Sequence, residues 1–265
     1  MDVSDIVREY YNQNVEMEWG RIEGRPEFLL TCRFLDRYIK PGDKVLDIGG
    51  GPGRYSFYLA EKGCDVTLLD ISPENVAFAK ARAAAESVSL KAVVGDGRWV
   101  ENSVTEVYDH VLLMGPMYHL QEEAERVQAV ESALKRLKKG GLLFASFISS
   151  FAGIIYFMKQ APTQIMLDSE VEFIQHCREQ KSFAGLGFTE TFMVEKTEVV
   201  PFFEHFSLEK LHLFSQEGIL TPCEERIMSQ SPEVVKVWLD LAEQFCERED
   251  MLSWGEHLMY IGRYI

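Results

Sequence analysis

Four glycines and three aspartates are the residues of this 265-residue chain whose types and spacing point most directly to chemistry. Asp47 lies just before the glycine-rich segment 49–53, and Asp70 and Asp96 each come at the end of a later apolar run. Glycines let a backbone turn tightly and let a ligand approach it closely. A helix that begins after such a turn presents free N–H groups. The pattern therefore predicts a binding loop for a polar ligand, with carboxylates beside it.

Two classes of ligand use such a loop. The dinucleotide fingerprint GxGxxG places a diphosphate on the helix N-terminus, but read from Gly49 it requires glycine at position 54, where this chain has Arg54. Asp47 is a poor neighbour for a diphosphate and a good one for an ammonium group. Asp70 can accept hydrogen bonds from a ribose diol, and Asp96 from an exocyclic amine of a purine. The three carboxylates together suit a cationic nucleoside that carries an amino acid, and S-adenosylmethionine is such a molecule.

Each aspartate also has a purely structural interpretation. Asp47 could cap the loop, Asp70 could cap a helix or lie at the surface, and the dipeptide Gly95-Asp96 is an ordinary turn signal. The set of three is more specific than any one member, so the ligand-binding interpretation is favoured.

The elements that must position these residues follow from the hydrophobic pattern. Short apolar runs alternate with helical patterns, which predicts βαβ units and a parallel sheet covered by helices on both faces. Right-handed crossovers place the carboxyl ends of these strands at one edge, where the glycines and aspartates would meet. The predicted fold class is α/β, a doubly wound, mostly parallel, seven-stranded sheet. The first five predicted strands are Val45–Ile48, Val66–Ile71, Leu90–Val94, Val111–Met114 and Leu142–Ile148.

Other elements are expected outside these strands. Ser72-Pro73 predicts the start of a helix. A second helix is predicted because apolar residues recur at helical spacing, at Val127, Val130, Leu134 and Leu137. The C-terminal end of this second helix is expected to carry Lys135, Arg136, Lys138 and Lys139. Downstream, the pattern predicts a helix from about Leu208, a strand near Ile219, a helix from Pro232 to about Phe245 and a last strand, His257–Tyr264, with the last two strands forming an antiparallel edge.

The whole chain, residues 1–265, is expected to form a single domain. Its predicted parts are a helical lid (1–40), a donor-binding core (41–150), an inserted cap over the acceptor site (151–206) and C-terminal sheet elements (207–265). The cap contains nine phenylalanines. They indicate either an apolar acceptor pocket or a small core that the cap needs for itself.

At these motifs the chain resembles the class I S-adenosylmethionine-dependent methyltransferases, especially the small-molecule branch related to quinone-biosynthesis enzymes. VLDIGGGPG is similar to the first motif of the family, LLDIS to its ribose-binding acidic position, VVGDGR to its adenine-edge position, and YDHVLLMGPMYHL to its fourth strand and following loop. The resemblance covers residues 40–150 and extends to a helical lid upstream. It implies S-adenosylmethionine as cofactor and S-adenosylhomocysteine as product. It places at the cofactor Asp47, Gly49, Gly50, Gly51, Gly53, Asp70, Ile71, Asp96, Gly97, Met114 and Gly115, with Tyr11 and Arg21 of the lid.

The acceptor side is expected at the loop after the fourth strand, which carries Tyr118 and His119. Methyl transfer is an in-line displacement from an activated donor, so it chiefly requires alignment and exclusion of water. A base is needed only if the acceptor must lose a proton. His119, with an unperturbed pKa of about 6.5, is the candidate base, and a structural histidine is an equally good interpretation. In the lid, Arg21 is expected to pair with the carboxylate of the cofactor and Tyr11 to reach the same end.

Composition limits the partners. Lys plus Arg total 27 and Asp plus Glu total 42, a net charge of −15, which argues against a nucleic-acid partner because phosphate binding relies on Lys and Arg. The five cysteines form no CxxC pair, which indicates reduced thiols and a cytoplasmic location. The other histidines, His257 among them, show no metal-ligand spacing, so no metal is expected. Residues 140–158 carry no charge, and a bilayer span is the minor alternative to a buried strand followed by a second buried element.

The predicted function is methyl transfer from S-adenosylmethionine to an O, N or C nucleophile of a small, partly apolar molecule, by a monomer or homodimer. The alternatives are an NAD(P)-dependent oxidoreductase and a protein that binds S-adenosylmethionine without catalysing transfer. A membrane-associated form acting on a lipid quinone is a further alternative. No stable membrane insertion is expected.

Overall fold

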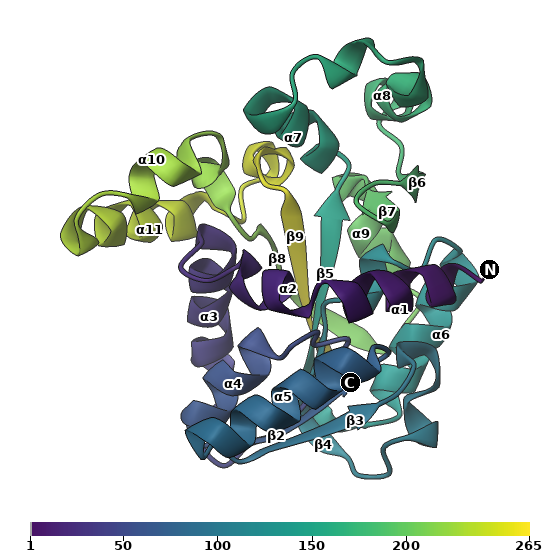
Figure 1. The fold of residues 1–265 in the computed structure, drawn as a ribbon, viewed down its shortest axis with the longest axis vertical. Coiled ribbons are helices and arrows are strands. Elements are labelled where there is room, and N and C mark those ends of the chain that lie inside the picture. Colours follow the sequence, from purple (N-terminus) through teal and green to yellow (C-terminus); the bar gives the residue numbers. More distant parts are fainter. Residues whose placement is uncertain (1) are drawn as a thin grey trace.

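The computed structural model describes residues 2–265, in which helices cover both faces of a twisted sheet (Figure 1). Within these residues the sheet has nine strands. They are β1 Lys44–Ile48, β2 Asp65–Asp70, β3 Leu90–Val94, β4 Tyr108–Leu113, β5 Leu137–Ser149, β6 Phe183–Leu186, β7 Glu190–Val194, β8 Leu208–Ser215 and β9 His257–Tyr264.

Seven of the strands form a continuous path in the order β3-β2-β1-β4-β5-β9-β8. Strands β3, β2, β1, β4 and β5 are parallel, and β9 runs antiparallel to both β5 and β8. The hairpin β6–β7 joins through β7, which pairs in parallel with Ile148 and Ser149 at the end of β5. The prediction of a doubly wound, mostly parallel, seven-stranded sheet is therefore confirmed, with the small hairpin as an addition.

The helices precede, connect and follow these strands. α1 and α2 lie across the carboxyl edge of the sheet, and α10 and α11 extend to one side (Figure 1). The α-helices are α1 Val3–Gln13, α2 Val15–Arg21, α3 Pro26–Tyr38, α4 Arg54–Glu61, α5 Pro73–Glu86, α6 Glu123–Leu134, α7 Ala152–Gln160, α8 Val171–Glu179, α9 Lys196–Phe203, α10 Glu224–Met228 and α11 Pro232–Phe245.

The two faces of the sheet bury different cores. Alternate residues of a strand point to opposite faces, so Leu46 and Ile48 of β1 contact one cluster, which also contains Val130 of α6. Val45 belongs to the cluster on the other face, with Phe34 of α3. Asp47 shares that second face, because it lies two residues from Val45. The alternation thus directs its carboxylate toward α4 rather than α6.

Local signals explain where two helices begin. The Ser72 hydroxyl accepts a hydrogen bond from the backbone N–H of Asn75 at 3.1 Å, and Pro73 is the first residue of α5, so the predicted start is confirmed. Gly53 precedes α4 with φ of 102°. A residue with a side chain rarely adopts such a backbone, so this glycine is needed for the turn into the helix.

One predicted helix is confirmed as α6, but its predicted C-terminal end is wrong. α6 ends at Leu134, and Leu137 already belongs to β5, paired with Tyr108 of β4. Lys138 and Lys139 therefore lie on a strand and not at the end of a helix. The apolar spacing was misleading because position 137 is buried by strand pairing, which spacing along one segment cannot reveal.

The second error concerns the chain after residue 206. Residues 208–215 form the strand β8, paired with β9 from Leu208 opposite Tyr264 to Ser215 opposite Leu258. Ile219 lies in a short 3-10 helix, Gly218–Cys223. The last helix and last strand are confirmed as α11 and β9, and β8 supplies the antiparallel partner that was expected near Ile219.

The phenylalanines of residues 151–206 pack partly against one another and partly against the main sheet. α7 and α8 lie beyond the carboxyl end of β5 (Figure 1). Phe173 contacts the rings of Phe157 and Phe183, with centroids 6.1 and 5.4 Å away. Phe203 stacks on Tyr260 of β9 at 3.9 Å. These phenylalanines therefore serve packing.

The charge-free stretch 140–158 divides between β5 and α7. Among residues 2–265, no helix combines the length and the apolar character that a bilayer span requires.

Candidate active site

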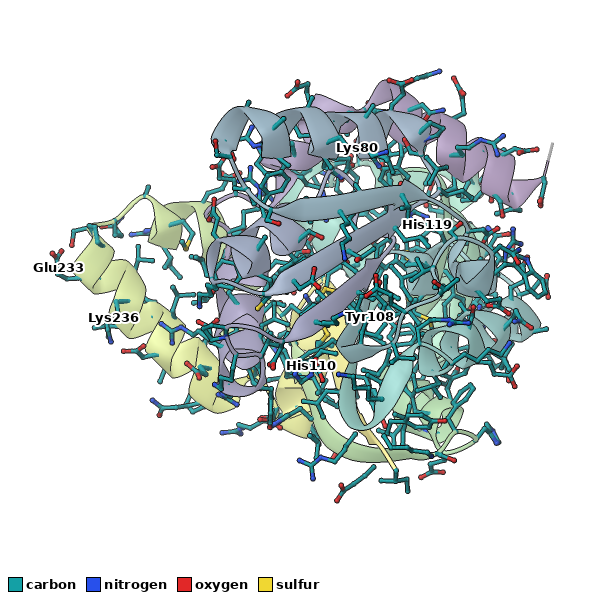
Figure 2. The ribbon with its side chains drawn as sticks, turned by 90° about the horizontal axis from the view of Figure 1, so that it is seen from below. Lys80, Tyr108, His110, His119, Glu233 and Lys236 are labelled. Carbon is teal, nitrogen blue, oxygen red and sulfur yellow. The ribbon has the colours of Figure 1, made fainter. Side chains whose placement is uncertain are left out.

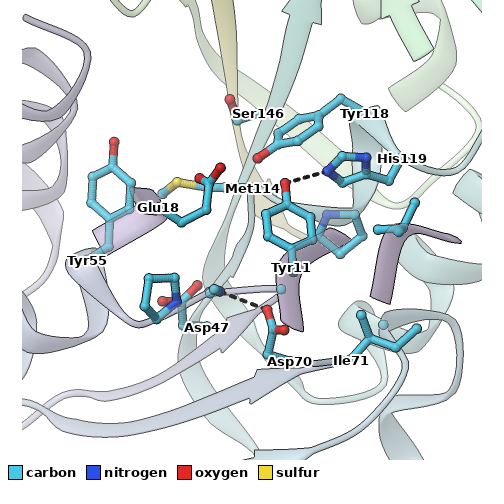
Figure 3. A pocket seen from close by; sticks show the side chains of 18 of the residues that line it. Tyr11, Glu18, Asp47, Tyr55, Asp70, Ile71, Met114, Tyr118, His119 and Ser146 are labelled. Atoms are coloured by element: carbon cyan, nitrogen blue, oxygen red, sulfur yellow. Dashed lines mark hydrogen bonds between the residues drawn. The ribbon is translucent and has the colours of Figure 1, made fainter. Parts of the chain in front are cut away.

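A pocket opens at the carboxyl edge of the sheet, with α1 and α2 forming one wall (Figure 3). Its empty volume, the open mouth included, is about 1170 Å³. Of the predicted site residues, all except Gly53 line it. These are Tyr11, Arg21, Asp47, Gly49, Gly50, Gly51, Asp70, Ile71, Asp96, Gly97, Met114, Gly115, Tyr118 and His119. Gly53 instead packs against Leu68 and Phe57 at the start of α4.

Asp47 lies beneath the glycine loop with only 2% of its surface exposed. Its Oδ2 accepts a hydrogen bond of 2.7 Å from the hydroxyl of Ser56 on α4. A Cβ on Gly50 would come within 2.6 Å of the same oxygen, so glycine is required for this close approach. Burial raises the pKa of Asp47 to about 7, although the Ser56 hydrogen bond lowers it. A cation bound nearby would favour the ionised carboxylate.

Asp70 joins the end of β2 to the glycine loop. Its Oδ2 accepts from the backbone N–H of Gly51 at 2.8 Å (Figure 3). Its Oδ1 accepts from the backbone N–H of Ser72 and from Asn75 Nδ2, at 2.9 and 3.2 Å. Burial raises the pKa of Asp70 despite these hydrogen bonds. A carboxylate has about four acceptor positions, so capacity for one more donor remains on the side that faces the pocket.

The loop has open space above Gly51. A Cβ built on this residue meets no atom within 4 Å, and its φ is +58°. The backbone is therefore bare toward the pocket, which allows a ligand to lie directly against it.

Asp96 is held by its own neighbour. Arg98 donates from Nη2 at 2.6 Å and from Nε to both carboxylate oxygens at 3.1 Å. Arg98 also donates to Ser4 Oγ of α1 at 2.8 Å. This pair ties the end of β3 to α1 and leaves Asp96 less free for a ligand than Asp70.

Gly115, directly after β4, lies against the glycine loop. A Cβ at this position would overlap the carbonyl of Gly49. Met114 precedes it, with 8% of its surface exposed, and lines the same wall. The absence of a side chain at position 115 therefore lets the loop after β4 approach the glycine loop.

Two further contacts tie the lid, α1 and α2, to the core. The Trp19 indole lies between two guanidinium groups, Arg54 at 3.8 Å and Arg82 at 4.0 Å from a ring centroid. Arg54 also donates to the Trp19 carbonyl from Nε and Nη2 at 2.9 and 2.6 Å. Such cation–π contacts add roughly 0.5–2 kcal/mol each.

The second tie passes through His119. Its Nε2 lies 2.7 Å from the Tyr11 hydroxyl and its Nδ1 lies 3.0 Å from the Glu190 carbonyl. A carbonyl can only accept, so Nδ1 carries the proton and Nε2 accepts from Tyr11. Burial lowers the pKa of His119 to about 4. With both nitrogens engaged, His119 has no free lone pair for the acceptor in this conformation, and the geometry favours the structural interpretation over the base.

Figure 2 places His119 beyond the end of β4, far from His110 and Tyr108 near its start. His110 Nε2 lies 3.4 Å from Asp43.

The far end of the pocket, beyond Met114, carries ionisable groups that the sequence did not indicate. Arg21 donates to Glu18 Oε2 at 3.0 Å and to Glu27 Oε2 at 3.1 Å. Burial raises the pKa of Glu18. Burial alone would also raise the pKa of Glu27, but Arg21 and His257 hold it below its ordinary value. Arg21 is thus already paired with protein carboxylates, whereas its predicted partner was the carboxylate of the cofactor.

Polar side chains from the C-terminal part of the chain complete this end. Ser146 of β5 hydrogen-bonds Gln216, and Gln216 Nε2 donates to Thr31 Oγ1 at 2.9 Å. His257 lines the pocket beside them. The Tyr55 hydroxyl is buried there without a hydrogen-bond partner among residues 2–265. In the sequence, the polar run Ser215-Gln216-Glu217 at the end of an apolar strand could have suggested site residues. It could not have shown which residues they contact.

Glu27, Glu217 and His257 bring three potential ligand atoms within 4.8 Å of one another. Arg21 and the ring of His257 are cations placed among these carboxylates and balance their charge. We therefore assign the cluster to a network of ion pairs rather than to a metal.

Comparison with known proteins supports the interpretation of this edge. Residues 45–141 match the family model described as "Methyltransferase domain". The chain is 31% identical over 113 residues to a ubiquinone biosynthesis O-methyltransferase of Xanthomonas campestris, covering 43% of this chain and 46% of the relative. It is 32% identical over 144 residues to a glycine/sarcosine N-methyltransferase of Parasynechococcus marenigrum, covering 53% and 51%. The chain thus spans about half the length of these curated relatives.

Two solved structures show the same fold at low sequence identity. Magnesium protoporphyrin IX methyltransferase from Synechocystis, with bound S-adenosylmethionine, has a TM-score of 0.58 and 14% identity, with 100% of this chain and 98% of that chain covered. The N-methyltransferase NodS from Bradyrhizobium japonicum, in complex with S-adenosylhomocysteine, has a TM-score of 0.54 and 14% identity, with 96% and 98% covered.

Proposed function

We propose that this chain, whose core is a class I S-adenosylmethionine-dependent methyltransferase domain, transfers a methyl group from S-adenosylmethionine to a nucleophile of a small molecule. The observation that carries the proposal is a single pocket with two chemically different ends. One end is bare glycine backbone with carboxylates at successive strand ends, and the other is a set of polar side chains. Both ends line one continuous pocket, so a donor at the first end and a small acceptor at the second would lie next to each other.

The donor end suits the cofactor in the chemistry of its groups. Asp70 accepts from the ribose hydroxyls with its remaining capacity, and Gly51 leaves the space that the ligand occupies. Asp47, beneath the loop, supplies negative charge near the ammonium group. Gly97 and the Asp96–Arg98 pair border the adenine, with Ile71 beside them. When bound, S-adenosylmethionine supplies a methyl group made electrophilic by the sulfonium.

The remaining residues align the acceptor and exclude water. Met114 and Gly115 form the passage between the two ends, so the nucleophile reaches the methyl carbon from the far end. The lid, held by the Tyr11–His119 hydrogen bond, closes the mouth on the other side. Holding reactants at near-attack distance contributes most of the rate enhancement of such a displacement.

The acceptor is a small molecule with a polar group at the end that faces Glu18, Glu27 and His257. The ring faces of Tyr11 and Tyr118 offer contact to an apolar part. Residues 151–206 do not line this pocket, so their phenylalanines do not select the acceptor directly. Phe188 of this segment instead contacts the rings of Tyr10 and His119 and so supports the lid from outside.

Titration calorimetry with S-adenosylhomocysteine, with NAD⁺ as control, tests the proposal. Micromolar affinity for S-adenosylhomocysteine alone is expected. Binding of NAD⁺ instead would revive the oxidoreductase alternative and overturn the proposal. Formation of S-adenosylhomocysteine in the presence of a panel of phenols, amines and quinones then distinguishes an enzyme from a protein that only binds the cofactor.

A further inference from the structure

A glutamate and a histidine form a tightly coupled pair at the far end of the pocket. Glu217 Oε1 lies 2.6 Å from His257 Nδ1, and Glu217 Oε2 accepts from the backbone N–H of His257 at 3.1 Å. One carboxylate therefore fixes both the ring and the main chain at the start of β9. Gly255 permits this arrangement, because a Cβ there would come within 2.6 Å of Glu217 Oε2.

The second ring nitrogen of His257 remains available. Nδ1 is the proton donor to Glu217, and Nε2 has no hydrogen-bond partner among residues 2–265. Nε2 is also not among the buried atoms that lack a partner. Because His257 lines the pocket, this nitrogen is the part of the ring that an acceptor can reach. His119, by contrast, has both nitrogens engaged.

The charges around the ring come from every element packed against it. Glu27 of α3 lies 3.9 Å from Nδ1, Arg21 of α2 binds Glu27 and Glu18, and Glu256 precedes β9. Burial lowers the pKa of His257, but the carboxylates of Glu27 and Glu217 raise it to about 9 in total. Burial raises the pKa of Glu217, and the charged ring opposes this shift. The ring is therefore protonated on both nitrogens at neutral pH, and Nε2 becomes a proton acceptor as the pH rises toward 9.

We propose that His257, oriented by Glu217, is the group that takes the proton from the methyl acceptor. This proposal rests on the proposed function and names the acceptor class: a group that keeps its proton at neutral pH and must give it up to be methylated, such as a phenol or an ammonium group. Model phenols and ammonium groups have pKa values of about 10 and 10.4, close to that of the His257 ring, so the proton would pass between groups of similar basicity.

A phenol can attack as it loses its proton, but an ammonium nitrogen has no lone pair and must lose its proton first. The oxygen or nitrogen of the acceptor then forms a bond to the methyl carbon, and the carbon–sulfur bond breaks with its electron pair going to sulfur. The acceptor proton moves to the neutral Nε2 of His257, which becomes an imidazolium paired with Glu217. At the alkaline pH at which the neutral ring is populated, the imidazolium then gives its proton to hydroxide or buffer as the products leave, and no other reactant is required.

The first test needs no acceptor. Histidine NMR of the full chain saturated with S-adenosylhomocysteine, titrated from pH 5 to pH 10, should show one ring with a pKa near 9. The assignment comes from the loss of that signal in His257→Asn. In Glu217→Gln the same pKa should fall by at least one unit, because the carboxylate no longer stabilises the imidazolium. An unchanged pKa in Glu217→Gln overturns the pair.

The second test measures transfer to substituted phenols and primary amines. In wild type, kcat should rise with pH up to about 9, and in Glu217→Gln the rise should shift to lower pH with the KM for S-adenosylmethionine unchanged. His257→Asn should lose 100-fold or more of kcat, within the usual range for a general base. Its affinity for S-adenosylhomocysteine should stay within twofold, which also shows that the variant folds. The exposed His205→Asn is the matched control and should leave all values unchanged.

The failures are distinguishable. If S-adenosylhomocysteine does not bind wild type, the proposed function falls first. If it binds but no phenol or amine is methylated, the acceptor class is wrong. If added EDTA abolishes turnover and Mg²⁺ or Zn²⁺ restores it, the cluster of Glu27, Glu217 and His257 holds a metal and the proton-transfer role is overturned.

Discussion

The two ends of the pocket are built in opposite ways. The donor end (residues 47–51, 70, 71, 95–97 and 114–116) comes from four neighbouring strand ends and consists largely of backbone. The acceptor end (Glu18, Arg21, Glu27, Tyr118, Ser146, Gln216 and His257, with Glu217 behind them) comes from segments far apart in the chain and consists of side chains. Backbone groups can bind a cofactor whatever the side chains are. Binding of one particular acceptor instead depends on which side chains stand at the acceptor end, and these can be substituted without changing the fold.

The charges differ in the same way. At the donor end, Asp47 and Asp70 are buried carboxylates that contact neutral donors. At the acceptor end, Arg21 and His257 are interleaved with three glutamates. The donor end therefore has negative charge to offer a cation, and the acceptor end is balanced internally.

The largest effect is expected where the two ends meet. In Gly115→Ala the new methyl group would overlap the carbonyl of Gly49, so the glycine loop must move. Affinity for S-adenosylhomocysteine should fall at least 100-fold in calorimetry, a loss of roughly 3 kcal/mol. Gly20→Ala is the control, because its Cβ meets nothing within 4 Å. Equal affinities of the two variants would show that the junction does not shape the donor end.

The next effect isolates the donor end. Asp70→Ala should weaken S-adenosylhomocysteine binding by about 1–3 kcal/mol, because it removes an acceptor for the ribose and leaves the Gly51 N–H without its partner. Asp65→Ala, at the exposed start of the same strand, provides the control and should change affinity little. Unchanged affinity in Asp70→Ala would remove this residue from the binding site.

A pH titration tests whether the donor end depends on negative charge. With a pKa of about 7, Asp47 is protonated below neutral pH, so affinity for the cofactor should fall roughly tenfold or more from pH 7.5 to pH 5.5. Asp47→Asn should abolish this dependence and bind weakly throughout. Calorimetry at several pH values provides the measurement, and a wild-type affinity that is flat over this range would contradict the role.

Ionised Asp47 is expected to favour cofactor binding, whereas protonated Asp47 favours the folded state. The folded protein holds a proton on Asp47 up to pH 7, whereas the unfolded chain loses it near pH 3.8. Its contribution to the free energy of unfolding is therefore full below pH 3.8 and declines as the pH rises to 7. Above pH 7, Asp47→Asn should be more stable than wild type, by up to about 4 kcal/mol, in urea unfolding of the ligand-free protein. A destabilised variant at pH 8 would contradict this account.

The smallest effect concerns the lid, which spans both ends. Tyr11→Phe removes the hydrogen bond to His119, worth about 1 kcal/mol. Stopped-flow measurement should show S-adenosylhomocysteine leaving about three- to tenfold faster. Tyr10→Phe is the control on the adjacent residue and should leave the rate unchanged. If both variants release the ligand at the wild-type rate, the hydrogen bond does not hold the lid.

The sequence predicted the sheet well where neighbouring residues carry the signal. The runs that became β1 to β5 were recognisable because strands buried on both faces are continuously apolar. Leu137 and the segment 208–215 were misassigned because a short apolar spacing fits a helix or a strand. Only the pairing of Leu137 with Tyr108, and of Leu208 with Tyr264, decides between them.

The sequence by itself determined the donor end. Parallel strands bring Asp47, Asp70 and Asp96 to one edge of the sheet, and the glycines indicate that a ligand approaches the backbone closely. Only the tertiary structure decided the acceptor end. Glu217 and His257 are 40 residues apart in sequence, and their pairing depends on how β8, β9 and the lid pack together. It also decided that His119 holds the lid while His257 faces the pocket. The physical reason is that the role of an ionisable side chain is set by its neighbours in space, which no spacing along the chain records.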